Sequence, residues 1–144
     1  MIKADFNLSA VRKYIAEQVR EYELHVIQAF TDAGNAWQER AKLKTKSQGS
    51  FGNITFNLRS SIGYILLKDG VELAESFEVV GTGDAGAEKG LAYARELAGN
   101  YPAGIVLICV AGMEYAAAVE SKGYDVITGS SLYMEQDLAE LLAA

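Results

Sequence analysis

The chain has 144 residues, a formal net charge of −6 and one cysteine, Cys109. This length fits one folded domain, and the acidic charge disfavours nucleic acid and anionic lipid as general partners. One cysteine excludes an internal disulfide and a multi-cysteine metal site. The start lacks the apolar stretch of a signal peptide, and the longest apolar run, residues 105–111, is too short for a membrane helix. We therefore expect a soluble protein made in the cytoplasm, with no membrane partner.

A helical apolar stripe runs from about residue 9 to residue 43. Its members recur every three or four positions and are Val11, Ile15, Val19, Tyr22, Val26, Phe30, Ala33, Trp37 and Ala41. Ser9 is the predicted N-cap. At 1.5 Å per residue the helix would be about 50 Å long, which exceeds the diameter of a small domain. One end is therefore expected to project or to pack on another subunit.

The next segment, residues 44–54, is polar and contains two glycines, which predicts a mobile loop. A group of cations stands at its entrance: Arg40, Lys42, Lys44 and Lys46. One interpretation is that they complement the C-terminal end of the helix dipole. The other is that they contact an acidic partner protein or DNA passing through a channel.

The remaining chain, residues 55–144, mixes strand and helix patterns. Asp69-Gly70 predicts a hairpin turn between two apolar runs. A helix is expected at 86–99, and "AGIVLICVAG" reads as a central buried strand. We predict a single α+β domain, 1–144, in which the long N-terminal helix packs on a mostly antiparallel sheet of about four strands, with two or three shorter helices.

Three further elements are expected toward the C-terminus. "MEYAAAVESKG" predicts a short helix that ends at Gly123, and "DVIT" predicts a short fourth strand. Ser130 or Ser131 is the predicted N-cap of a last helix.

A G-x-G-x-x-G run follows the second arm of the hairpin, at Gly81, Gly83 and Gly86. This order of strand, glycines and helix is typical of a dinucleotide site. However, Asp84 would place a carboxylate beside the pyrophosphate, and the preceding strand does not open a βαβ unit. The alternative interpretation is a glycine-rich crossover with Asp84 near a helix N-terminus.

Residues for catalysis or metal binding are sparse. His25 is the only histidine, and no serine stands in a nucleophile-elbow pattern. Histidines, cysteine and carboxylates do not occur at metal-ligand spacings. We expect no enzymatic activity, no cofactor and no small-molecule substrate.

Two segments resemble the signatures of a phage family. "TFNLRSSI" is similar to T-G-x-L-R-x-S-I and "EYAAAVESKG" to Y-A-x-x-V-E-x-G, both found in tail-completion, or head–tail joining, proteins of long-tailed phages and prophages. Phe56 stands where the family pattern has glycine, and one extra residue precedes Gly123. The matching positions are Thr55, Leu58, Arg59, Ser61, Ile62, Tyr115, Ala116, Val119, Glu120 and Gly123.

The resemblance implies a non-enzymatic subunit that assembles into a homo-oligomeric ring at the neck or tail end of the particle. Its partners would be copies of itself and other neck or tail proteins. The protein would occupy the bacterial cytoplasm during assembly and the virion afterwards. We also expect Arg59 and Glu120 either to form an ion pair or to be two independent surface charges.

Two other functions stay open at this point. One is a small nucleotide- or NAD-binding protein that uses Gly81, Gly83 and Gly86. The other is a host protein that recognises a partner through the long helix.

Overall fold

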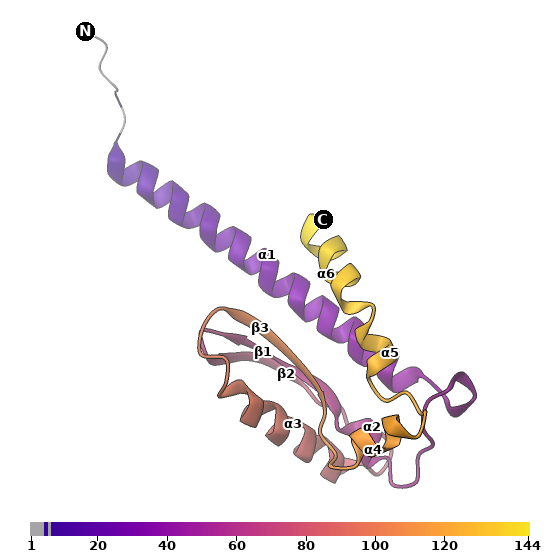
Figure 1. Ribbon diagram of the computed structural model, residues 1–144. Coiled ribbons are helices and arrows are strands. Elements are labelled where there is room, and N and C mark those ends of the chain that lie inside the picture. The colour runs from indigo at the N-terminus through magenta and orange to yellow at the C-terminus, as the bar shows by residue number, and fades with distance from the viewer. Residues whose placement is uncertain (1–4, 6) are drawn as a thin grey trace.

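The computed structural model describes residue 5 and residues 7–144 (Figure 1). The helices are α1 (Leu8–Leu43), α2 (Asn57–Ser60), α3 (Asp84–Ala98), α4 (Ala116–Ser121), α5 (Thr128–Ser131) and α6 (Met134–Ala143), with a 3₁₀ turn, η1, at Lys46–Gln48. The strands are β1 (Ile62–Lys68), β2 (Val71–Ser76) and β3 (Ile105–Ala111).

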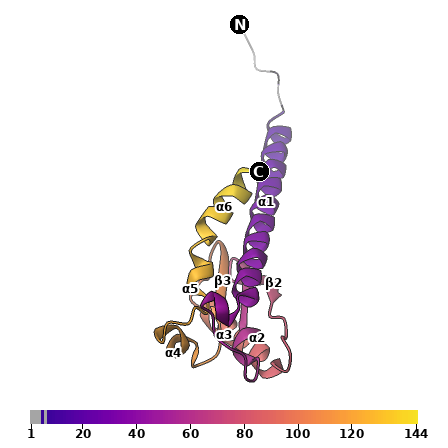
Figure 2. The ribbon, with the colours of Figure 1, turned by 90° about the vertical axis from the view of Figure 1, so that its right-hand side faces the viewer.

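The three strands form an antiparallel sheet in the order β2-β1-β3. The central strand β1 is buried from Ile62 to Leu67 because α1 covers one face of the sheet and α3 covers the other. Helices α5 and α6 pack along α1, as both ribbon views show (Figures 1 and 2). The N-terminal part of α1 extends beyond the sheet.

Two hydrophobic clusters lie on opposite faces of the sheet. Successive strand residues point to opposite faces, so Ile62 packs with Trp37 of α1, whereas Ile65 packs with Ala94 of α3. Trp37 is fully buried and its indole nitrogen donates to Ser131 Oγ at 3.1 Å. The sheet therefore lies between two apolar layers, one packed against α1 and the other against α3.

The predicted α+β class, long helix and hairpin are confirmed. The helix extends from Leu8 to Leu43 without interruption. The turn between β1 and β2 places Asp69 at φ 49° and Gly70 at φ 79°, which is the left-handed pair that a two-residue hairpin needs. The predicted N-cap is wrong by two residues, because Asn7 Oδ1 accepts the Ser9 and Ala10 amides at 2.9 and 3.4 Å.

The predicted fourth strand is wrong, and the sheet of the described residues has three strands. Asp125 makes an isolated bridge to Ser50, after which the chain turns into α5. The serine caps are also wrong, since both predicted residues lie within α5 and the last helix begins at Met134.

Part of the segment 44–54 is anchored, because Ser50 and Phe51 are buried in it. The mobility of this segment stays a prediction.

Among the described residues, no helix combines the length and apolar character that crossing a bilayer requires.

Candidate functional site

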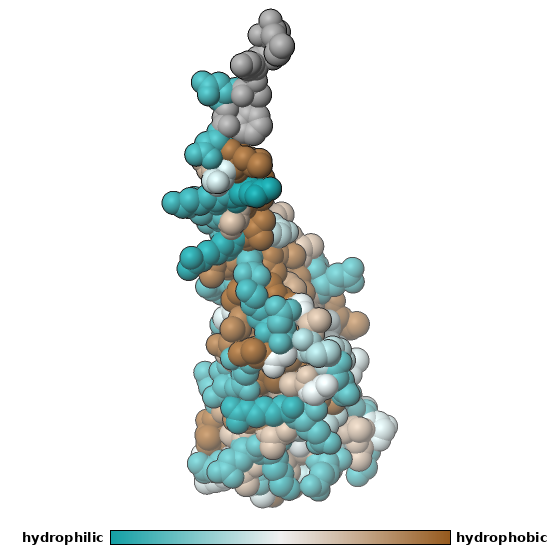
Figure 3. All heavy atoms as spheres, turned by 90° about the vertical axis from the view of Figure 1, so that its left-hand side faces the viewer, coloured by the Kyte–Doolittle hydropathy of each residue, from teal (hydrophilic) through white to brown (hydrophobic). Residues whose placement is uncertain are grey.

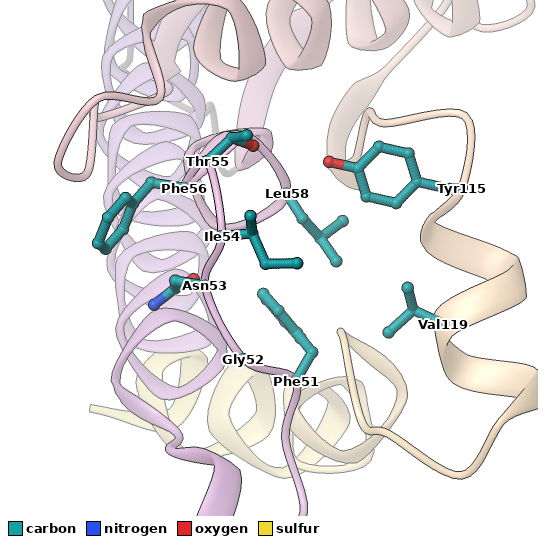
Figure 4. A pocket seen from close by; sticks show the side chains of 9 residues that line it. All are labelled: Phe51, Gly52, Asn53, Ile54, Thr55, Phe56, Leu58, Tyr115 and Val119. Atoms are coloured by element: carbon teal, nitrogen blue, oxygen red, sulfur yellow. The ribbon is translucent and has the colours of Figure 1, made fainter.

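The two segments that carry the phage resemblance meet in space. The first spans the end of the loop, α2 and the first residue of β1, and the second forms α4 and its flanks. Between them lies an open pocket of about 380 Å³. Figure 4 shows Phe51, Leu58 and Val119 directed into the pocket, while Phe56 turns away. The lining residues are Phe51, Gly52, Asn53, Ile54, Thr55, Phe56, Leu58, Tyr115 and Val119.

Several motif residues are part of the core rather than of a surface. Leu58, Ile62 and Ala116 are buried in the cluster that surrounds Trp37. Ser61 is fully buried and its hydroxyl donates to Leu58 O at 2.7 Å. These residues hold α2 and α4 against the sheet, so their structural role is clear without any ligand.

Arg59 fastens the C-terminal end of α1. Its side chain is 6% exposed, and its guanidinium donates to the carbonyls of Lys42, Lys44 and Phe51 and to Asn53 Oδ1. It also lies 4.6 Å from the centroid of the Phe51 ring. The last carbonyls of a helix have no partner within the helix, and a cation there also complements the helix dipole. Arg59 thus closes the long helix and ties the following loop to α2.

Glu120 does the corresponding work at the start of α5. Its Oε1 accepts the amides of Val126, Ile127 and Thr128 at 3.2, 2.8 and 2.9 Å, and its Oε2 accepts the Thr128 hydroxyl at 2.7 Å. A carboxylate is favoured at a helix N-terminus, where amides lack partners. Downstream of it, Gly123 adopts φ 90°, which lets the chain leave α4.

The ion pair between Arg59 and Glu120 is therefore wrong, and so is the alternative of two independent surface charges, because Arg59 is buried. Each charged side chain is committed to backbone groups of a different helix end. Backbone carbonyls and amides at helix ends lack partners within the helix, and these two charged side chains bind them here, which explains a charge among apolar neighbours.

Replacing Glu120 should remove part of the acid sensitivity of the fold. Burial raises the pKa of Glu120, but its hydrogen bonds outweigh burial and hold the pKa below the ordinary value. Stability from such a group is present above the unfolded pKa of about 4.3 and is lost as the pH falls through the lower folded pKa. We expect Glu120→Gln to melt below the wild type at pH 7, and the gap to close toward pH 3 in thermal melts. A gap that does not change with pH would contradict this role.

Three of the four cations at the end of α1 make polar contacts with other parts of the chain. Arg40 forms an ion pair with Asp137, Lys44 forms one with Asp125, and Lys42 binds a backbone carbonyl.

The other two cations differ from each other. Lys42 Nζ donates to Glu78 O at 2.8 Å, whereas Lys46 is exposed on η1. These contacts are with other elements rather than with the end of α1 itself, so the helix-dipole interpretation stays a prediction, and Lys46 is the most exposed cation of the group.

The glycine run packs α3 against α2. A Cβ at Gly86 would lie 2.0 Å from Asn57 O, and one at Gly83 would lie 2.5 Å from Phe56 O. A Cβ at Gly81, which adopts φ 56°, would lie 2.8 Å from the Phe56 ring, and the Gly86 amide donates to Asn57 Oδ1 at 3.1 Å. Protein atoms thus fill the space from which a pyrophosphate would approach these glycines. Asp84 is the first residue of α3, as the crossover interpretation expects.

The titratable side chains that could serve chemistry are dispersed. Burial raises the pKa of the Cys109 thiol to about 12, so the thiol stays protonated and unreactive. His25 Nε2 lies 3.2 Å from Leu142 O and joins α1 to α6. Across residue 5 and residues 7–144, histidine, cysteine and carboxylate side chains do not gather in threes around a point where a metal ion could bind.

Sequence reasoning did not single out residues 51–54 of the pocket lining, which include the large apolar side chains of Phe51 and Ile54. Ile54 is 96% exposed at its edge, and Phe51 forms one wall. The available signal was two large apolar residues in an otherwise polar, glycine-containing segment.

No family model, curated protein or solved structure matches the chain.

Proposed function

We propose that the protein is a non-enzymatic structural subunit of a phage or prophage, which assembles with copies of itself and with other neck or tail proteins, as tail-completion proteins do. The observation that carries this proposal is the shared apolar pocket. Its lining combines residues of both signature segments, which lie more than 50 residues apart in the sequence, with residues 51–54 of the preceding loop. The resemblance therefore concerns one place in the fold.

The backbone at Phe56 supports the resemblance independently. Phe56 stands at the glycine position of the family signature and adopts φ 64°, ψ 0°. Glycine adopts this left-handed conformation readily, whereas other residues pay about 1 kcal/mol or more. A glycine in the family pattern is thus what the local geometry of this chain calls for.

The chemistry of the pocket favours a protein partner over a substrate. Its lining includes no carboxylate, imidazole, thiol or amine. Ile54, nearly fully exposed at the edge, and the half-exposed Tyr115 offer apolar and aromatic surface of the kind that anchors protein interfaces. Ring assembly by head-to-tail contacts would bury this pocket against a neighbouring subunit. The protein would then reside in the host cytoplasm before assembly and in the virion afterwards.

Particle assembly tests the proposal directly. We expect genes for capsid, portal or tail-tube proteins beside this gene, and deletion of the gene should leave heads and tails unjoined in electron micrographs. Ile54→Asp should lower the yield of infectious particles about tenfold or more, because each 1.4 kcal/mol of lost contact is a factor of ten. The matched control is Val71→Asp, an exposed apolar residue on the hairpin, which should assemble normally.

Complete, tailed particles from the deletion strain would contradict the proposal. A genome neighbourhood without virion genes would do the same. An effect of Val71→Asp equal to that of Ile54→Asp would show that the pocket is not the assembly surface.

A further inference from the structure

The first 15 residues of α1 are exposed, and none of them is covered by another element within residues 7–144. Lys68 Nζ contacts Glu23 at 2.7 Å, and the next contact is that of His25 with Leu142. The first buried residue of the helix is Ala29. Residues 8–22 therefore project roughly 22 Å beyond the sheet, at 1.5 Å per residue. We call residues 8–22 of α1 the free segment (Figure 1).

The free segment carries an apolar stripe on one face. Its five members are between 39% and 65% exposed, and a brown band follows the projecting helix between teal side chains in Figure 3. The same stripe continues into the core at Ala29, Ala33 and Trp37, so it is the face that the sheet covers farther along the helix. A helix face of this kind needs a partner. Its members are Leu8, Val11, Ile15, Val19 and Tyr22.

The spacing of the stripe is symmetric about Ile15. The steps from Leu8 to Tyr22 are three, four, four and three residues, and Ile15 is also the midpoint of the free segment 8–22. An antiparallel copy of the segment would place Val11 opposite Val19, Leu8 opposite Tyr22, and Ile15 opposite itself. Both copies would be covered over the whole free length without reaching the end of the sheet. This is the self-complementarity of a twofold interface.

The charges of the segment favour the same direction. Residues 8–15 contain Arg12 and Lys13 and no carboxylate, whereas residues 16–23 contain Glu17, Glu21 and Glu23 against Arg20. Antiparallel pairing brings the basic half beside the acidic half, and parallel pairing would bring each half beside its own kind.

We infer that the free segment of α1 is a self-association surface, which pairs antiparallel with the same segment of a second copy around a twofold axis at Ile15. The inference goes beyond the proposed assembly role and does not depend on it. Helices α2 and α4, whose residues contribute to the shared apolar pocket, lie toward the opposite end of α1 (Figure 1), so the pocket stays open in such a dimer. The interface is small, so the dimer should be in rapid exchange with monomer.

Sedimentation of the full chain over a range of concentrations tests the inference. The wild type should pass from monomer to dimer. Ile15→Glu places two carboxylates together at the axis and should raise the dimer Kd at least about tenfold, the factor that 1.4 kcal/mol produces. Leu24→Glu is the matched control, because Leu24 is exposed on the opposite face of α1 and should dimerise like the wild type. Unchanged helix content and Tm would show that both variants fold.

Disulfide trapping in a Cys109→Ala background determines the direction. Val11→Cys mixed with Val19→Cys should form a covalent dimer, and neither variant alone should. Self-linking of Val11→Cys would mean a parallel pair and would overturn the inference. So would a wild type that stays monomeric at every concentration, which would leave the stripe to a different protein, or an Ile15→Glu variant that dimerises normally.

Discussion

Arg59→Met is expected to be the most destabilising substitution among the signature residues. It removes the donors to the Lys42, Lys44 and Phe51 carbonyls and leaves a buried side chain that cannot replace them. A buried polar group without a partner costs about 1–3 kcal/mol. We expect a loss of about 3 kcal/mol in the free energy of unfolding, which corresponds to a Tm lower by about 9 °C for a chain of this size.

Two further variants separate the helix-end role from a general loss of charge. Arg59→Lys keeps the charge but not the fork of donors, and should fall between Arg59→Met and the wild type. Arg95→Met removes an arginine that binds Glu72 with two hydrogen bonds at the surface, and should change the Tm much less. Hydrogen exchange should increase at residues 42–51 in Arg59→Met. Wild-type protection there, together with an unchanged Tm, would show that Arg59 does not fasten α1.

The elements that sequence patterns predicted correctly are those set by local rules. The long helix follows from apolar residues at steps of three and four, and the hairpin follows from Asp69-Gly70. The predicted fourth strand failed because a side chain six to eight residues earlier binds its backbone amides. Glu120 takes the amides of Val126, Ile127 and Thr128, and these amides then start α5 instead of joining the sheet.

The site was only partly accessible to sequence reasoning for a similar reason. An arginine among apolar residues predicts a hydrogen-bonding partner. When that partner is a backbone carbonyl, any residue type can supply it, so the sequence does not identify which residue it is. An ion pair between Arg59 and Glu120 and two independent surface charges were the alternatives that we expected, because a sequence displays side chains and not the backbone groups that they bind. The pocket depends on the meeting of α2 with α4, which local periodicity does not encode.

Gly86→Ala is expected to lower stability as a packing substitution. The added Cβ would meet the Asn57 carbonyl oxygen at 2.0 Å, and this atom belongs to the backbone of α2. Helix α3 would have to move away from α2, and overpacking of this kind costs about 1–3 kcal/mol. Gly99→Ala is the matched control. Its Cβ would lie 3.4 Å from Glu96 O, and its backbone is right-handed helical, so its stability should equal or slightly exceed that of the wild type.

The same variants decide between packing and nucleotide binding when they are melted with and without NAD, NADP or ATP. Binding to the folded state raises the Tm in proportion to ligand concentration over Kd. Because α2 fills the approach to Gly83 and Gly86, we expect no shift for the wild type, while Gly86→Ala melts lower in every condition. A ligand-dependent rise in the wild type that Gly86→Ala abolishes and Gly99→Ala retains would instead establish a nucleotide site at these glycines. That result would also require α3 to separate from α2, since both cannot occupy the same space.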